Sequence, residues 1–221
     1  MSQHHTETVS CPECGREFEF TVWDSVNTAL DPEMKARVRT GELFLWTCPG
    51  CGAKRWIEYA TLYHQMEDHV MIWYTPNDPS EAIRHFETVK RGGDPAVTAD
   101  ADYRSRVVTS RYQLREKLMA LDEGLDDRVL ELMKPFELLA LQTESVRIDE
   151  IFFDKAPDGE RVFVLRLADG RWARAPFEQG LYDHVAESWA DELAKDDSVR
   201  IDFSWAWTLM DENRDGDESD G

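Results

Sequence analysis

All four cysteines of the chain lie in two motifs of the same form, CPECG at residues 11–15 and CPGCG at residues 48–52. We call these the first and second knuckle. Two residues between paired cysteines let both sulfur atoms face one ion, and the glycine that follows permits positive φ. Four thiolates are the ligand set of a structural zinc ion. The sequence therefore predicts a zinc site with four ligands: Cys11, Cys14, Cys48 and Cys51.

A site closed by four protein ligands leaves no position at which the metal could activate a substrate. The sequence also contains no phosphate-binding glycine loop and no nucleophile motif, and it nominates no catalytic residue. These features favour a zinc-binding protein-interaction or scaffold module with an unidentified protein partner. Whether the chain is an enzyme is left open, and the sequence leans against it; a site between its two halves is the enzymatic alternative.

Other chemistry is open to the same cysteines. Iron in a rubredoxin-like site uses the same knuckles, although zinc is favoured. Disulfides are disfavoured, because four cysteines in a 221-residue chain without a signal sequence indicate a reducing compartment. A redox-active pair is disfavoured as well, because both pairs lie in strand-like sequence rather than in a βαβ unit.

The charge of the chain bears on nucleic-acid binding. Arg16, Lys54 and Arg55 lie beside the knuckles, where basic side chains can offset the negative charge of a four-thiolate centre. A formal net charge of −20 repels phosphate backbones, so charge compensation is the favoured role of these residues. A nucleic-acid-binding zinc ribbon is the alternative.

Large aromatic residues accompany the same region. Tryptophans in or beside the expected strands are predicted to be mostly core, with one or two on the surface as anchors for a partner. These are Trp23, Trp46, Trp56 and Trp73.

The elements that must position the knuckles can be read from periodicity. Strands are predicted over 18–23, 43–47, 54–59 and 70–74. A helix is expected to begin at Asp31-Pro32-Glu33 and to end before Gly41. The N-terminal part is thus predicted to be a zinc-ribbon-like sheet with an inserted helix.

A helical middle segment and a mixed C-terminal part follow. Helices are predicted after Asp78, after Ser110 and from Asp126, with Pro135 ending or kinking the last. A linker is expected over 92–102. The C-terminal part is predicted as a β-meander (146–153, 161–167 and 171–175), a helix over about 177–195 and a final strand over 199–207. The fold class is therefore α+β.

This pattern predicts three parts: a zinc-binding domain with a helical continuation (1–140), an α+β domain (141–210) and an acidic disordered tail (211–221). No apolar run approaches about eighteen residues, the length that a membrane span needs. A cytoplasmic protein without membrane contact is expected, and the oligomeric state is left open.

The paired knuckles, the inserted helix start, Gly41-Glu42-Leu43 and the stretch from Leu62-Tyr63-His64 to Pro76 together resemble the CpXC domain family. The later segments Arg106-Val107-Val108, Glu116-Lys117 and 124–128 are similar to the helical continuation that accompanies it. The resemblance covers roughly residues 9–134. It implies metal binding and a bacterial or archaeal origin, and it implies no established activity.

Overall fold

The computed structural model describes residues 2–90, 103–141 and 146–217, with side chains described as far as residue 213. Contacts between residues divide the chain into two compact units, unit 1 (Met1–Arg115) and unit 2 (Glu116–Gly221). The predicted domain limits at residues 140 and 210 would have to be tested by asking which parts of the chain fold on their own, so they stay predictions.

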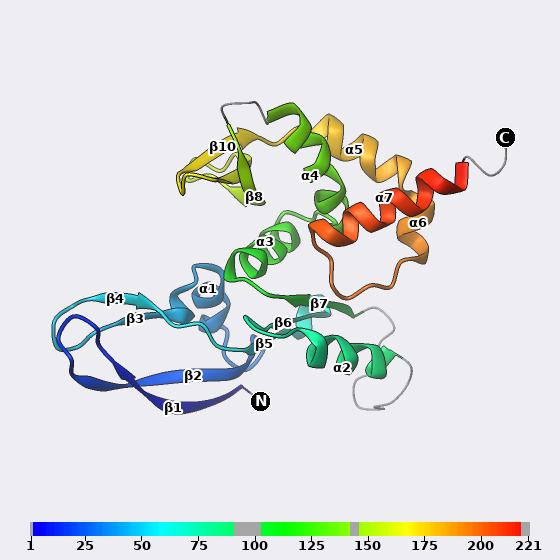
Figure 1. The fold of residues 1–221 in the computed structure, drawn as a ribbon. Coiled ribbons are helices and arrows are strands. Elements are labelled where there is room, and N and C mark those ends of the chain that lie inside the picture. Colours follow the sequence, from blue (N-terminus) through cyan, green and yellow to red (C-terminus); the bar gives the residue numbers. More distant parts are fainter. Residues whose placement is uncertain (1, 91–102, 142–145, 218–221) are drawn as a thin grey trace. The chain divides into compact units, whose positions relative to one another are not determined.

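The main sheet of unit 1 has five strands in the order β1-β2-β5-β6-β7 (Figure 1). Neighbours are antiparallel within β1–β2 and β5–β6 and parallel within β2–β5 and β6–β7. The strands are β1 (Gln3–Ser10), β2 (Glu17–Asn27), β5 (Thr61–Gln65), β6 (Val70–Tyr74) and β7 (Arg104–Val108). The sequence did not predict β1, whose residues are nearly all exposed.

A second, two-stranded sheet of unit 1 pairs β3 (Leu45–Thr47) with β4 (Lys54–Trp56) in antiparallel fashion. The predicted inserted helix is confirmed as α1 (Glu33–Arg39), although no side chain caps its first turn. The short helix η1 (Glu42–Phe44) connects α1 to β3. Two further helices are η2 (Met66–Asp68) and α2 (Ser80–Lys90).

Part of the buried core of unit 1 lies where η1 meets the main sheet. Phe44 is fully buried, and its ring packs edge-on against Tyr74 of β6 at a centroid distance of 5.2 Å. The ring of Tyr59 packs on the same Phe44 at 5.0 Å. Aromatic pairs of this kind add to the free energy gained from burial. They hold the segment that leads into β3 and β4.

Unit 2 contains a three-stranded antiparallel sheet in the order β10-β9-β8, which confirms the predicted β-meander. Its strands are β8 (Ile148–Lys155), β9 (Arg161–Leu167) and β10 (Trp172–Pro176). The helices are α3 (Arg111–Asp122, which begins in unit 1), α4 (Asp127–Leu141), α5 (Gln179–Ser188), α6 (Ala190–Lys195) and α7 (Phe203–Asp217). The α+β class is thus confirmed.

Two helix predictions for unit 2 need correction in detail. The helix expected over 177–195 is divided into α5 and α6 at Trp189, whose backbone is not helical. Pro135 lies inside α4, which continues to Leu141, so the proline does not end that helix.

The predicted final strand over 199–207 is wrong, because α7 begins at Phe203. The alternation of apolar residues suggested a strand, but Asp202 caps a helix: its Oδ1 accepts a hydrogen bond from the Trp205 amide at 3.1 Å. Ala206, one turn into the helix, is fully buried in the core of unit 2. Helical spacing therefore governs which residues are buried here.

Residues 211–217 belong to α7, so the predicted disordered tail does not begin at residue 211. Residues 218–221 and the whole of the predicted linker over 92–102 lie outside the described residues. Among the described helices, none has the length and apolar character that crossing a bilayer requires.

Five charged side chains are buried together between α3 and α4 in unit 2. Lys134 Nζ lies 2.9 Å from a carboxylate oxygen of Glu116 and 2.9 Å from one of Glu131. Lys117 Nζ lies 2.8 Å from Glu131 and 3.4 Å from Asp127. We call these five residues the buried charge cluster. The sequence analysis did not predict this cluster, because charged residues on a helix are usually solvated.

Candidate metal centre

Each knuckle forms the turn of an antiparallel hairpin. The first lies between β1 and β2, and the second lies between β3 and β4. Figure 1 shows the two hairpin turns at the same end of unit 1. The strands therefore bring together two segments that are far apart in the sequence.

The two turns have the same backbone geometry. In the first, the Gly15 amide donates to the Cys11 carbonyl at 2.9 Å; in the second, the Gly52 amide donates to the Cys48 carbonyl at 2.9 Å. Both glycines have positive φ, +68° and +76°. A residue with a side chain rarely adopts such angles, which explains the glycine after each cysteine pair. The repeated motif thus produces a repeated structure.

The four sulfur atoms converge on one point. Cys11 Sγ lies 3.6 Å from Cys51 Sγ, Cys14 Sγ lies 3.8 Å from Cys48 Sγ, and all four lie within 4.8 Å of one another. The four cysteines are free thiols. Sulfur atoms bound tetrahedrally to zinc at about 2.3 Å are separated by roughly 3.8 Å. The donor set and its spacing fit a four-coordinate metal ion.

Arg16 links the two knuckles. Its Nη2 donates a hydrogen bond to the carbonyl of Gly50 at 2.6 Å, and the Gly50 amide donates to Cys48 Sγ at 3.4 Å. Hydrogen bonds from the Arg16 amide and guanidinium lower the pKa of the Cys14 thiol to about 6. This shift favours the thiolate of Cys14, which is the form that binds metal.

The structure distinguishes the basic residues predicted to compensate the centre. Arg16 contacts the second knuckle directly, whereas Lys54 and Arg55 are exposed on β4. Compensation by Lys54 and Arg55 stays a prediction.

The tryptophans near the centre also differ in exposure. Trp46 is 4% exposed and belongs to a small apolar cluster with Cys11 and Cys48. Trp23 and Trp73 are partly buried, and Trp56 is 41% exposed. Trp46 therefore helps to bury Cys11 and Cys48, while Trp56 is available for contact with another molecule.

The role of Gly50 was not foreseen from the sequence. A Cβ atom at this position would lie 2.3 Å from Arg16 Nη2 and 2.8 Å from Phe18 Cζ. The signal in the sequence is the difference between the knuckles: the first has Glu13 where the second has Gly50. Only the second must leave room for an arginine from the other hairpin.

Substituting Gly50→Ala is expected to weaken metal binding by about tenfold to a hundredfold, the usual effect of losing an interaction that orients a ligand. The added methyl group would displace the Arg16 guanidinium and its hydrogen bond to the Gly50 carbonyl. Competition with a chromogenic chelator measures the affinity. The control is Gly180→Ala in α5, where an added Cβ would meet nothing within 4 Å. Equal affinities for both variants would show that the Arg16 contact does not support the site.

Residues 9–134 match the sequence model of a family described as CpXC protein, and this range includes all four cysteines and more than half of the chain. No curated protein and no solved structure matches the chain.

Proposed function

Because the chain belongs to the CpXC protein family and its four thiols converge, we propose that it is a cytoplasmic zinc-binding protein that acts as a protein-interaction or scaffold module. The observation that carries this proposal is the cluster of four sulfur atoms within 4.8 Å. Four protein ligands complete a tetrahedral site, so the ion would organise the hairpin ends rather than activate a substrate. Zinc is preferred over iron, which the same thiolates can bind.

Exposed apolar residues of unit 1 support an interaction role. Leu30 is 57% exposed and Met66 is 45% exposed. Both lie beside Asn27, whose backbone carbonyl accepts from the Leu30 amide and whose Nδ2 donates to Met66 Sδ. Neighbouring exposed apolar side chains are a feature of partner-binding surfaces. This surface is the one that we expect a partner protein to cover.

Nucleic-acid binding is the second candidate, since Lys54, Arg55 and Trp56 are exposed in succession on β4. Basic and aromatic side chains together can bind single strands. The net charge of −20 opposes this role. The interaction role is therefore preferred.

The proposal is tested by capturing partners of the full-length chain in its native cells. We expect one or more proteins to co-purify with the wild-type chain and to be lost from a Cys48→Ser, Cys51→Ser variant. A Leu30→Asp, Met66→Asp variant, which leaves the cysteines in place, should lose the same proteins.

The matched control carries Leu139→Asp, which changes an apolar side chain of unit 2 that is 77% exposed. It should retain the partner. Titration of single-stranded and duplex oligonucleotides at several salt concentrations is the second arm. Salt-dependent oligonucleotide binding without any specific protein partner would overturn the proposal in favour of the nucleic-acid role.

A further inference from the structure

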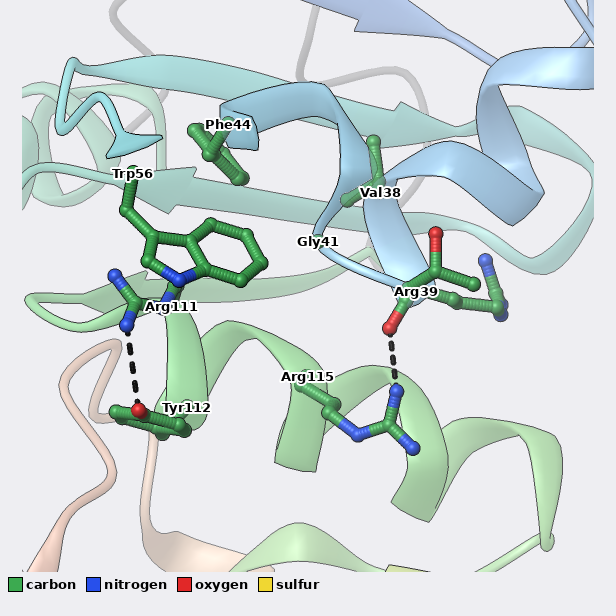
Figure 2. A pocket seen from close by; sticks show the side chains of 9 residues that line it. Val38, Arg39, Gly41, Phe44, Trp56, Arg111, Tyr112 and Arg115 are labelled. Atoms are coloured by element: carbon green, nitrogen blue, oxygen red, sulfur yellow. Dashed lines mark hydrogen bonds between the residues drawn. The ribbon is translucent and has the colours of Figure 1, made fainter. Parts of the chain in front are cut away.

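Unit 1 contains a cavity of about 260 Å³ on the side of η1 that faces the first turn of α3. Figure 2 shows it with Trp56, Arg111 and Tyr112 on one side and Arg115 on the other. The buried side chains of Val38 and Phe44 supply an apolar part of its lining. All lining residues belong to unit 1, and none of them is an Asp or a Glu. The cavity thus combines apolar surface with hydrogen-bond donors.

Arg111 is held rigidly at the cavity. Its guanidinium lies over the Trp56 ring at 4.4 Å and over the Tyr112 ring at 4.9 Å. Its Nη1 forms an ion pair with Glu58, and its Nη2 donates to the Tyr112 hydroxyl at 3.2 Å. Cation–π contacts and hydrogen bonds together fix the orientation of a guanidinium. A ligand would therefore lose little free energy in ordering this side chain.

Arg115 lies one helical turn after Arg111, so both side chains project from the same face of α3. Its Nη1 donates to the backbone carbonyl of Arg39 at 2.7 Å, across the cavity from Trp56 (Figure 2). The Arg39 guanidinium is directed elsewhere, to Tyr63 and Gln65. Two guanidinium groups, those of Arg111 and Arg115, thus border the cavity from opposite sides.

The chemistry of this lining is unusual for the chain. The protein has a formal net charge of −20, yet arginines and aromatic rings border this cavity, with no carboxylate among its lining residues. Guanidinium groups bind carboxylate and phosphate with planar, paired hydrogen bonds. Small-molecule sites combine apolar walls with a few convergent polar groups in this way, and the cavity is slightly smaller than their usual range of about 300–1,000 Å³.

We propose that the cavity binds a small organic anion, with its carboxylate or phosphate group between Arg111 and Arg115 and its apolar body against the exposed ring of Trp56. Binding of this anion requires neither Zn²⁺ nor the partner surface. The site is a second functional feature of unit 1, separate from the four cysteines.

The test follows the Trp56 indole N–H of the full-length, metal-loaded chain by ¹H–¹⁵N NMR, with the signal assigned from a Trp56→Phe variant. The probes are benzoate, phenyl phosphate, inorganic phosphate and uncharged benzamide. Benzoate or phenyl phosphate should shift the signal saturably, and the tighter of the two identifies the preferred head group. Benzamide and inorganic phosphate should bind more weakly, because each lacks one half of the recognised chemistry.

Substituting Arg115→Gln should lower the affinity for the organic anion by about tenfold or more, as expected for a lost hydrogen bond between charged groups. Arg55→Gln removes the same charge from an exposed position next to Trp56 and should leave the affinity unchanged. Arg115→Lys keeps the charge without the paired donors, and its affinity for the anion should lie between those of Arg115→Gln and Arg55→Gln. This intermediate affinity would show that the loss in Arg115→Gln is not caused by a folding defect.

Three results would overturn the proposal. The first is the lack of a saturable shift with either organic anion at millimolar concentration. The second is an equal loss of affinity in the Arg115→Gln and Arg55→Gln variants. The third is binding of benzamide or inorganic phosphate as tight as that of the organic anions.

Discussion

Removing the metal from the full-length chain is expected to unfold the β3–β4 hairpin and the turn between β1 and β2, while the β8–β10 sheet of unit 2 stays folded. Among the described residues, the buried cluster around the knuckles consists of Cys11, Trp46 and Cys48, with partly buried apolar residues packed against it. The β3–β4 pair has only three residues in each strand. An isolated hairpin of this kind is marginal in water, so its folding should depend on the ion.

Hydrogen exchange of the backbone amides measures this result before and after chelation. The amides of Gly15, Cys48 and Gly52, which are protected by hydrogen bonds within the knuckles, should exchange rapidly once the metal is lost. Free energies of structural zinc binding are about 10–16 kcal/mol in small zinc-dependent domains, so the expected effect is large. The strands of unit 2 provide the internal control.

Cys48→Ser, Cys51→Ser should reproduce the effect of chelation without a chelator. Unchanged protection of the knuckle amides in a sample shown to be free of metal would contradict a structural role for the ion.

Substituting Lys134→Met is expected to destabilise unit 2 by about 3–5 kcal/mol, the usual cost of removing one partner from a buried ion pair. Lys134 is 4% exposed and lies between the carboxylates of Glu116 and Glu131. Methionine can fill the space of the lysine stem, but it leaves two buried carboxylates facing each other. Of the five residues in the buried charge cluster, Lys117 would then be the one that is positively charged, beside three acids.

The pH dependence of this loss follows from the carboxylates. Burial raises the pKa of Glu116 to about 7, although Lys134 opposes the shift. A carboxyl whose pKa is higher in the folded state than in the unfolded state favours folding at low pH, and this contribution is lost as the pH rises through the folded value. Without Lys134 the same pKa should rise further. The free energy of unfolding that the Lys134→Met variant loses should therefore be largest above pH 7 and smaller near pH 5.

Urea unfolding at several pH values measures the free energies, and two further variants sharpen the comparison. Lys195→Met changes an exposed lysine at the end of α6 and should cost less than about 0.5 kcal/mol. Lys134→Met combined with Glu116→Gln should recover part of the lost stability, because it removes one of the unpaired charges. If Lys134→Met and Lys195→Met cost the same, the buried charge cluster does not stabilise unit 2 as described.

The parts of the fold that the sequence predicted are those specified by local signals. The two knuckles carry their own turn chemistry, and Ser110 was predicted to begin α3, where its hydroxyl accepts from the Gln113 amide at 3.1 Å. The β-meander was predicted from its turns, where Gly159 and Gly170 have positive φ. In each case the residues that specify the structure are neighbours in the chain.

The parts that the sequence did not predict depend on distant contacts. β1 is polar and is a strand because all its residues pair with β2. In α7 the alternation of apolar residues predicted a strand, whereas the structure shows a helix that Asp202 caps and that buries Ala206 in the core of unit 2. The cavity requires Trp56 of β4 to meet Arg111 of α3. No pattern within either segment of the sequence predicts this contact.

The central claim is that one zinc ion is bound by four cysteine sulfurs, and X-ray absorption at the zinc edge tests it most directly on the full-length chain. We predict four sulfur neighbours at about 2.3 Å around the ion and no oxygen neighbour. A folded chain without zinc, or a zinc ion with an oxygen or nitrogen atom among its ligands, would contradict the account.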